Sequence, residues 1–101
     1  MTHVAINRIP VQPGNDERIQ HAARAFFETR RPLLGGDLRS MQLVRSADGH
    51  EYVLISVGAS PEADARHEND AAEQHVAREL GSIAAGAPVE FTGSVVVELE
   101  T

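Results

Sequence analysis

The chain has 101 residues, 42% of them apolar and 24% charged, which is typical of one globular domain spanning residues 1–101. Its net charge of −6 excludes the basic groove that a nucleic-acid partner needs. The lack of Cys excludes thiol catalysis, disulfides and thiolate metal sites, and the lack of Lys excludes Schiff-base chemistry and a Walker-type phosphate site.

A first strand is predicted over residues 3–11, HVAINRIPV, from its β-branched and apolar residues. Side chains alternate between the two faces of a strand, so Asn7 shares one face with Ala5 and Ile9. An unpaired amide between two apolar neighbours is costly. Asn7 is therefore expected either to pair within the fold or to face a cavity.

An amphipathic helix is predicted next. Asn15 can cap it, and Asp16 and Glu17 suit the positive end of a helix. Apolar residues then recur at three- and four-residue steps, at Ile19, Ala22, Ala23, Phe26 and Phe27. Pro32 and the Gly35-Gly36 pair close this segment.

A hairpin and a second helix follow. The segments 38–46 and 51–57 flank Asp48-Gly49, which is a strong hairpin signal. Ser60-Pro61-Glu62 combines an N-cap, a proline at the first helical position and an acid in the first turn. We expect this helix to continue to about Leu80 and to stop at Gly81. Its apolar face is thin and is built mainly from Ala65, Ala72, Val76 and Leu80.

The last predicted strand covers residues 89–100, where apolar and polar side chains alternate most clearly. The resulting order, β-α-β-β-α-β, indicates an α+β, ferredoxin-like split βαβ fold with a four-stranded antiparallel sheet and two helices on one face. The first strand and residues 52–57 are apolar on both faces. A sheet that is apolar on both sides, with helices for only one, predicts a homodimer packed sheet to sheet.

Five histidines are the natural candidates for chemistry. His3 and His50 lie at a terminus and a turn, and His21 lies at a helix edge, so structural or solvated positions are expected for them. His75 follows Ala71 and Ala72 by about one turn, so its imidazole could border the space beside a helix faced with small residues. His67, Glu68 and Asp70 are interpreted as a solvated surface, because two metal ligands on an acidic helix are weak support for a site.

The segments AINRIPVQPGNDERIQ, FFETRR and SPEA, the strand–hairpin–strand unit and His75 together resemble the antibiotic biosynthesis monooxygenase family. The resemblance covers nearly the whole chain and is strongest to the small heme-degrading branch. It implies a dimeric α+β barrel. It also implies that His75 ligates heme iron, that Asn7 hydrogen-bonds near the distal ligand, and that heme is the cofactor.

The sequence departs from that branch at several positions. His67 stands where the branch usually carries a Trp beside the heme, so His67 is included among the cofactor-binding candidates. Gly58 and Asp64 replace a common strand aromatic and a helix Phe, and LLGGDL replaces a Pro-Gly-Phe segment. The loss of these bulky side chains is expected to enlarge or open the pocket.

Three functions are compatible with these residues. The first is a heme-degrading monooxygenase with His75 as axial ligand and Asn7 as distal donor. The second is a cofactor-independent oxygenase of aromatic, polyketide-like or quinol substrates, with His75 as base and Asn7 stabilising a substrate oxyanion. The third is a non-catalytic dimeric module that binds a small ligand. No signal peptide or membrane span is recognisable, so a cytoplasmic location without membrane or nucleic-acid partners is expected.

Overall fold

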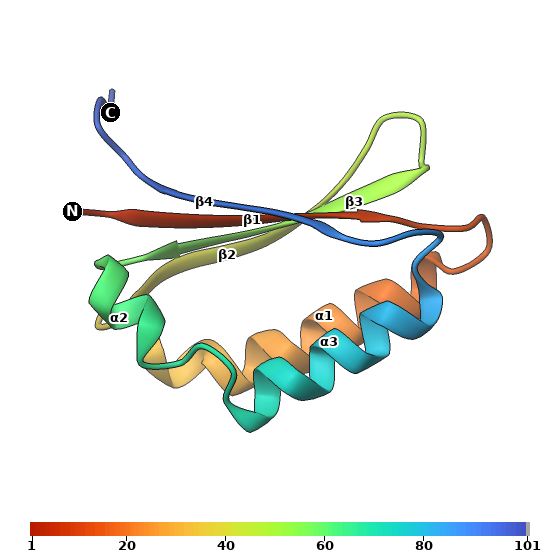
Figure 1. Ribbon diagram of the computed structural model, residues 1–101, viewed down its shortest axis with the longest axis horizontal. Coiled ribbons are helices and arrows are strands. Elements are labelled where there is room, and N and C mark those ends of the chain that lie inside the picture. Colours follow the sequence, from red (N-terminus) through yellow and green to blue (C-terminus); the bar gives the residue numbers. More distant parts are fainter. Residues whose placement is uncertain (101) are drawn as a thin grey trace.

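The sheet carries both long helices on one of its faces (Figure 1). The structure, a computed structural model, describes residues 1–100. In chain order the elements are β1 (His3–Pro10), α1 (Asp16–Arg30), η1 (Arg31–Leu33), β2 (Leu38–Arg45), β3 (Glu51–Gly58), α2 (Pro61–Ala65), α3 (Ala71–Ile83) and β4 (Val89–Ser94).

The four strands form one sheet in the order β2-β3-β1-β4, and each neighbouring pair is antiparallel. The crossover through α1 carries the chain from β1 past β3 to the edge strand β2, and the crossover through α3 carries it from β3 to β4. This confirms the predicted ferredoxin-like α+β fold. The hairpin turn also forms as expected, with Gly49 at φ +76° and the Asp48 carboxylate accepting a hydrogen bond from the His50 amide.

The core lies between the sheet and the two long helices. Ile9 from β1, Ile19 from α1 and Tyr52 from β3 are fully buried, and Val76, Leu80 and Ile83 close the core from α3. The Tyr52 hydroxyl donates to Asp16 at 2.6 Å and accepts from Gln20 at 3.1 Å, so its buried polar atom is satisfied. Because Ile9 faces the helices, Asn7 and Ala5 face them too.

The second predicted helix is in fact two helices. α2 ends at Ala65, and α3 starts at Ala71. The expectation that Gly81 ends the helix is also wrong, because α3 continues through Gly81 to Ile83 and Val76, Leu80 and Ile83 all bury their side chains. Asn15 precedes α1, but its side chain makes no capping hydrogen bond.

The last strand is shorter than predicted. β4 pairs with β1 only from Val89 to Ser94, and residues 95–100 form no strand. The last backbone hydrogen bond of this region joins the Val95 amide to the Thr2 carbonyl at 2.9 Å. The alternation that predicted a strand to residue 100 has no pairing partner within the chain.

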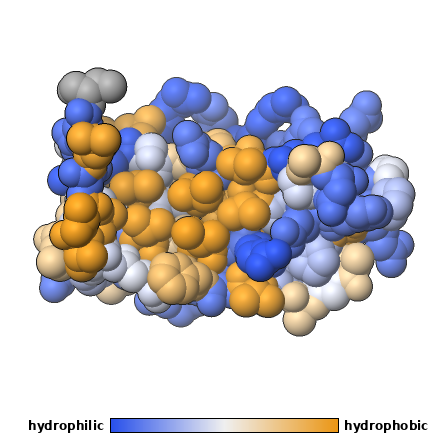
Figure 2. Space-filling model, turned by 90° about the horizontal axis from the view of Figure 1, so that it is seen from above, coloured by the Kyte–Doolittle hydropathy of each residue, from blue (hydrophilic) through white to orange (hydrophobic). Residues whose placement is uncertain are grey.

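The sheet face opposite the helices is apolar (Figure 2). Register places eight apolar side chains on this open face: Val4, Ile6, Val44, Val53, Ile55, Val57, Val89 and Phe91. Val44, Val89 and Phe91 are exposed. No helix within residues 1–100 is long and apolar enough to cross a membrane.

Candidate functional site

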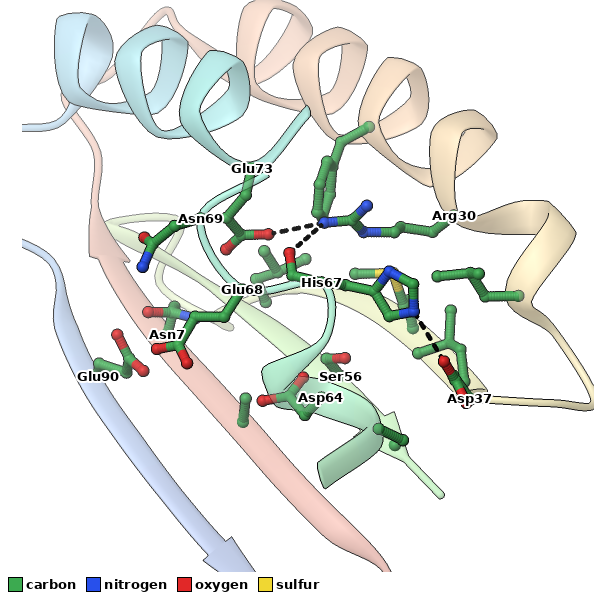
Figure 3. Close-up of a pocket in the computed structure, with 18 residues that line it drawn as sticks. Asn7, Arg30, Asp37, Ser56, Asp64, His67, Glu68, Asn69, Glu73 and Glu90 are labelled. Carbon is green, nitrogen blue, oxygen red and sulfur yellow. Dashed lines mark hydrogen bonds and ion pairs between the residues drawn. The ribbon is translucent and has the colours of Figure 1, made fainter. Parts of the chain in front are cut away.

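A cavity of about 160 Å³ lies at one end of the helix-bearing face of the sheet (Figure 3). The strands form its floor, and the chain between α2 and α3 covers it. Its apolar lining comes from Ala5, Phe26, Leu33, Leu38, Met41, Leu54 and Ala63, and its polar lining from Asn7, Arg30, Asp37, Ser56, Asp64, His67, Glu68, Asn69, Glu73 and Glu90. Gly58 completes the boundary.

The break between α2 and α3 creates the cover of this cavity. Asn69 adopts φ +62°, a left-handed conformation that Asn tolerates better than most residues and that ends a helical path. Asp70 then starts α3 as its N-cap and accepts the Glu73 amide at 2.9 Å. His67, Glu68 and Asn69 therefore lie in a turn over the sheet.

Arg30 fixes this turn to α1. It is only 7% exposed, and its guanidinium donates to Asp70 at 2.6 and 3.0 Å, to Glu73 at 3.3 Å and to the His67 carbonyl at 3.3 Å. It also stacks over the Phe26 ring, 4.8 Å from the centroid. The Arg30 guanidinium lowers the pKa of Asp70 to about 2. Burial raises the pKa of Glu73 above its ordinary value.

His67 and Asp37 form a hydrogen-bonded pair on one side of the cavity (Figure 3). The His67 Nε2 atom lies 2.8 Å from the Asp37 carboxylate. Arg66 donates twice to the same carboxylate, at 2.7 and 3.2 Å. Hydrogen bonds from Arg66 and then His67 hold the pKa of Asp37 well below its usual range. The ionised carboxylate accepts from Nε2–H, which leaves Nδ1 as the basic nitrogen of the ring.

Asn7 lines the same cavity from β1. This is the second of the two positions expected for it, facing a cavity instead of pairing within the fold. It is paired across the strands with Leu54 of β3 and Glu90 of β4. Among residues 1–100 its side-chain amide makes no hydrogen bond. An amide at the wall of a cavity can present both a donor and an acceptor to a ligand.

The cavity is strongly acidic. Five carboxylates line it together with one arginine, Arg30: Asp37, Asp64, Glu68, Glu73 and Glu90. Arg66 forms an ion pair with Asp37, and Arg30 forms one with Glu73. Within the described chain, Glu68 and Glu90 have no ion-pair partner, and Figure 3 shows both near Asn7. A concave site lined by one sign of charge attracts ligands of the opposite charge and repels those of the same charge.

His75 is not at this cavity, so the expectation that it borders the space beside its helix is wrong. Its side chain is 64% exposed and pairs with Glu79 one turn later on α3. Val76 is buried and Ala72 packs against the core, as the predicted apolar face requires, while His75, the residue before Val76, faces solvent. The structure therefore does not bring Asn7 and His75 together.

The interpretation of His67, Glu68 and Asp70 as a solvated surface holds for Glu68, which is exposed, but is wrong for His67 and Asp70, which are half-buried. His67 lines the cavity, Glu68 lies beside it, and Asp70 binds Arg30. His3 differs from expectation as well: its side chain is 15% exposed and its Nε2 lies 3.5 Å from Asp64. Its Nδ1 is buried with no hydrogen-bond partner among residues 1–100. His21 and His50 are exposed, as expected.

Gly58 and Asp64, the two positions that depart from the resembling branch, both line the cavity. A Cβ on Gly58 would meet its nearest neighbour, the Asp37 carbonyl oxygen, at 3.6 Å, an ordinary contact. A larger side chain there would project into a space already bounded by Asp64 and Ser60. This geometry is consistent with the expectation that Gly58 and Asp64, in place of two aromatic side chains, enlarge or open the pocket.

Sequence reasoning missed Asp37, Arg30 and Glu73. A signal for the helix break was present, because Asp70 followed by Glu73 has the spacing of a capping box. Arg30 and Asp37 carried no local signal, since their partners lie 29 to 43 residues away. No group of three or more metal-ligating side chains occurs within residues 1–100.

Comparison with solved structures confirms the fold. The structure of Rv0793 from Mycobacterium tuberculosis matches with a TM-score of 0.84 at 20% identity, covering 99% of this chain and 100% of that one. A proposed antibiotic biosynthesis monooxygenase from Caulobacter crescentus CB15 matches with a TM-score of 0.83 at 20% identity, covering 95% and 91%. No protein-family model and no curated protein matches the sequence.

The N63A mutant of SnoaB, a cofactor-independent oxygenase from Streptomyces nogalater, is also similar. Its TM-score is 0.78 at 22% identity, and the match covers 99% of this chain and 98% of that one. The chain thus has the fold of the antibiotic biosynthesis monooxygenases over nearly its full length.

Proposed function

We propose that the chain belongs to the antibiotic biosynthesis monooxygenase family and is a cofactor-independent monooxygenase of small, uncharged, electron-rich phenols. The observation that carries the proposal is the His67–Asp37 pair, which shares one cavity with the unpaired amide of Asn7. A similar fold in a cofactor-independent oxygenase supports it. The base assigned to His75 from the sequence is replaced by His67.

The residues present do not fit heme. The expected axial ligand, His75, is exposed on the far side of α3. The remaining cavity histidine, His67, has its Nε2 engaged by Asp37. A cavity of about 160 Å³ is below the range of about 300–1,000 Å³ that drug-sized ligands occupy. The carboxylates of Glu68 and Glu90 would also repel the two propionates of heme.

His67 is suited to act as a general base toward a phenol. Asp37 accepts from Nε2–H and so orients the ring, leaving the Nδ1 lone pair for the substrate proton. When His67 gains that proton, Asp37 stabilises the imidazolium that forms. Such a pair typically contributes a factor of about 10² to 10⁴ in rate.

Asn7 is suited to bind the oxygen of the deprotonated phenol. Its NH₂ group can donate to an oxyanion, and the cavity wall fixes its position on β1. Asn7 also counters the repulsion that the neighbouring carboxylates would exert on that oxygen.

The reaction needs no further reductant, because the substrate supplies all four electrons that reduce dioxygen. The phenolate adds dioxygen at its para carbon, and His67 returns its proton to the resulting peroxide. Loss of the para C–H proton then breaks the O–O bond. One oxygen atom stays as the second quinone carbonyl, and the other leaves as water. Phenol plus dioxygen thus gives quinone plus water, with all atoms balanced.

The charge of the cavity limits the substrate class. An anionic ligand would meet the unpaired Glu68 and Glu90 carboxylates, so we expect uncharged substrates to bind better than acidic ones. An engineered apolar cavity of about 150 Å³ holds one benzene molecule, so a single substituted ring suits this volume.

We also propose that the protein works as a homodimer joined through the open face of the sheet. Val4, Ile6, Ile55 and Phe91 lie together on that face, and nothing within residues 1–100 covers them. Exposed apolar patches of this kind mark interaction sites, and a two-fold dimer buries the same patch on both copies.

The test compares dioxygen uptake with 2,6-dimethoxyphenol and with a carboxylated phenol, 2-hydroxy-3-methoxybenzoate, in metal-depleted protein. The proposal predicts uptake with the uncharged phenol and a kcat/KM at least about tenfold lower for the acid, since tenfold corresponds to about 1.4 kcal/mol. Binding of the phenol without uptake would leave a ligand-binding module and overturn the catalytic proposal.

A further inference from the structure

A second hollow, of about 270 Å³, adjoins the cavity between β2 and α1. Arg30, Leu38 and Met41 line both spaces, so these three side chains form the wall between them. On its other side the hollow is bordered by Leu34 and Arg39, which are exposed. The cavity that would hold the phenol is therefore separated from a solvent-facing hollow by these three side chains.

Met41 is the one residue of this wall that is free to change its shape. Arg30 is only 7% exposed and is held by hydrogen bonds to Asp70 and Glu73. Leu38 is equally buried. Met41 is half-buried and makes no comparable anchoring contact, and its unbranched side chain adapts to irregular gaps. The width of the passage between the two spaces therefore depends on Met41.

Strand register places Met41 at the end of the cavity floor. Met41 of β2 pairs with Ser56 of β3, which pairs with Ala5 of β1, and Ser56 and Ala5 both line the cavity. Asn7 lies two residues along β1 on the same face as Ala5. Figure 3 shows Asn7 on the opposite side of the cavity from Asp37, the residue before β2. A ring whose oxygen binds Asn7 therefore has Met41 at the β2 end of its floor.

The volumes on the two sides of the wall decide how large a ligand can be. The cavity of about 160 Å³ suits one ring, since a cavity of about 150 Å³ holds one benzene molecule. With the hollow of about 270 Å³ added, the joined space enters the range of about 300–1,000 Å³ that larger ligands occupy. Phe27 and Leu34 line the hollow, and both suit an uncharged aromatic group.

We propose that Met41 is the specificity-determining residue that limits the substrate to a single ring. Its side chain closes the cavity toward β2, and a smaller side chain joins the cavity to the hollow, so that a second ring can pass between them. The inference rests on the proposed phenol monooxygenase and deepens it by naming the residue that limits substrate size.

Two matched phenols test the limit. 2-Methoxy-6-phenylphenol differs from 2,6-dimethoxyphenol only in carrying a phenyl ring in place of one methoxy group, and it keeps the para C–H that the reaction needs. Calorimetry under nitrogen measures the binding of both without turnover. Wild type should bind the phenyl compound at least about tenfold more weakly, which is about 1.4 kcal/mol. Met41→Ala should bring the ratio of the two dissociation constants to about one.

Leu43→Ala is the matched control. Leu43 lies two positions further along β2, is half-buried and packs against the same core, but lines neither the cavity nor the adjoining hollow. Leu43→Ala should lower the melting temperature much as Met41→Ala does and leave the wild-type ratio unchanged. Met41→Val, which suits a strand and removes less volume, should shift the ratio in the same direction if Met41→Ala does not fold. Equal ratios in the Met41 and Leu43 variants would overturn the proposal.

A second substitution locates the added ring. Leu34→Asp puts a charge into the hollow, so in the Met41→Ala background it should restore at least about tenfold discrimination against the phenyl compound. With Met41 in place, Leu34→Asp should leave the affinity for 2,6-dimethoxyphenol unchanged, because Leu34 does not line the cavity. Undiminished binding of the phenyl compound by the double variant would place its second ring elsewhere and overturn the proposal.

Dioxygen uptake by the same variants separates this inference from the proposed catalysis. The ratio of kcat/KM for the two phenols should follow the ratio of their dissociation constants. If the binding ratio responds to Met41 but neither phenol supports uptake, the catalysis is overturned and the size limit stands. If wild type binds and turns over both phenols equally well, the size limit is overturned and the catalysis stands. Binding of neither phenol would overturn both.

Discussion

The imidazole of His67 is bound through Nε2 to Asp37 at 2.8 Å, although the two residues are 30 positions apart and belong to different connecting segments. The carboxylate is fixed in turn by Arg66. This arrangement gives a histidine a defined tautomer at the wall of a cavity. It is the relationship on which the proposed chemistry depends.

Replacing Asp37 by Asn should reduce kcat by about 10² to 10⁴, because the amide no longer fixes the tautomer or stabilises an imidazolium. The KM for the phenol should change little, since Asp37 acts through His67. Steady-state dioxygen uptake measures both parameters. Asp48→Asn in the distant hairpin is the control, and an equal loss of kcat there would contradict the assignment.

Replacing Asn7 by Leu, which keeps the size of the side chain, should lower kcat/KM by about 10² through loss of one donor to the oxyanion. Asn7→Ser, whose hydroxyl supplies a different hydrogen-bond donor, should lose less of kcat/KM than Asn7→Leu. Calorimetric binding of the unreactive analogue 1,2,3-trimethoxybenzene should be nearly unchanged by both, because that analogue has no hydroxyl to ionise. Unchanged turnover in Asn7→Leu would exclude the role.

A large side chain at position 58 should fill the cavity and prevent the phenol from binding there. Gly58→Leu should raise the dissociation constant of the phenol at least about tenfold, because the added atoms occupy the space that the ring needs. Gly58→Ala should bind nearly normally, since its Cβ makes only a 3.6 Å contact. Isothermal titration calorimetry distinguishes them, and tight binding to Gly58→Leu would place the ligand elsewhere.

The ion pair of Arg30 and Asp70 should make the free energy of unfolding depend on pH in the acid range. The pKa of Asp70 is lowered to about 2, so its stabilisation is complete above the ordinary carboxyl pKa and is lost as pH falls through 2. Asp70→Asn keeps a capping side chain and, because the carboxylate is partly exposed, should cost only about 1 kcal/mol at pH 7. The difference from wild type should shrink toward pH 2 in urea titrations.

The exposed pair of Arg31 and Glu28 provides the matched control for that experiment. Glu28→Gln should have no measurable effect on the free energy of unfolding, because exposed ion pairs contribute little. A constant difference between Asp70→Asn and wild type from pH 7 to pH 2 would show that the ionised carboxylate is not the source of the stabilisation.

The order of strands and helices could be predicted from the sequence because each element carries local signals. The alternation around Asn7, the periodicity from Ile19 to Phe27 and the Asp48-Gly49 turn all act over a few residues. The facing of Asn7 followed from the same rule, because Ile9 two positions later belongs to the core.

The candidate site could be predicted only in part because it depends on contacts between distant segments. One left-handed residue, Asn69, ends the helical path between α2 and α3, so His67 lies in a turn at the cavity, while His75 lies on the exposed side of α3. Arg30 stabilises that turn from α1, and no local pattern links it to Asp70 forty residues later. The end of β4 at Ser94 was likewise unpredictable, since residues 95–100 alternate as a strand does but have no partner in the chain.

Oxygen transfer under ¹⁸O₂ tests the central claim most directly. Metal-depleted wild-type protein is mixed with 2,6-dimethoxyphenol, and the quinone is analysed by mass spectrometry beside His67→Ala and His75→Ala variants. The proposal predicts one ¹⁸O atom per quinone with wild type and with His75→Ala, and product at the protein-free background with His67→Ala. Equal labelled product from His67→Ala and wild type would contradict the role of His67, and no labelled quinone from wild type would contradict the monooxygenase itself.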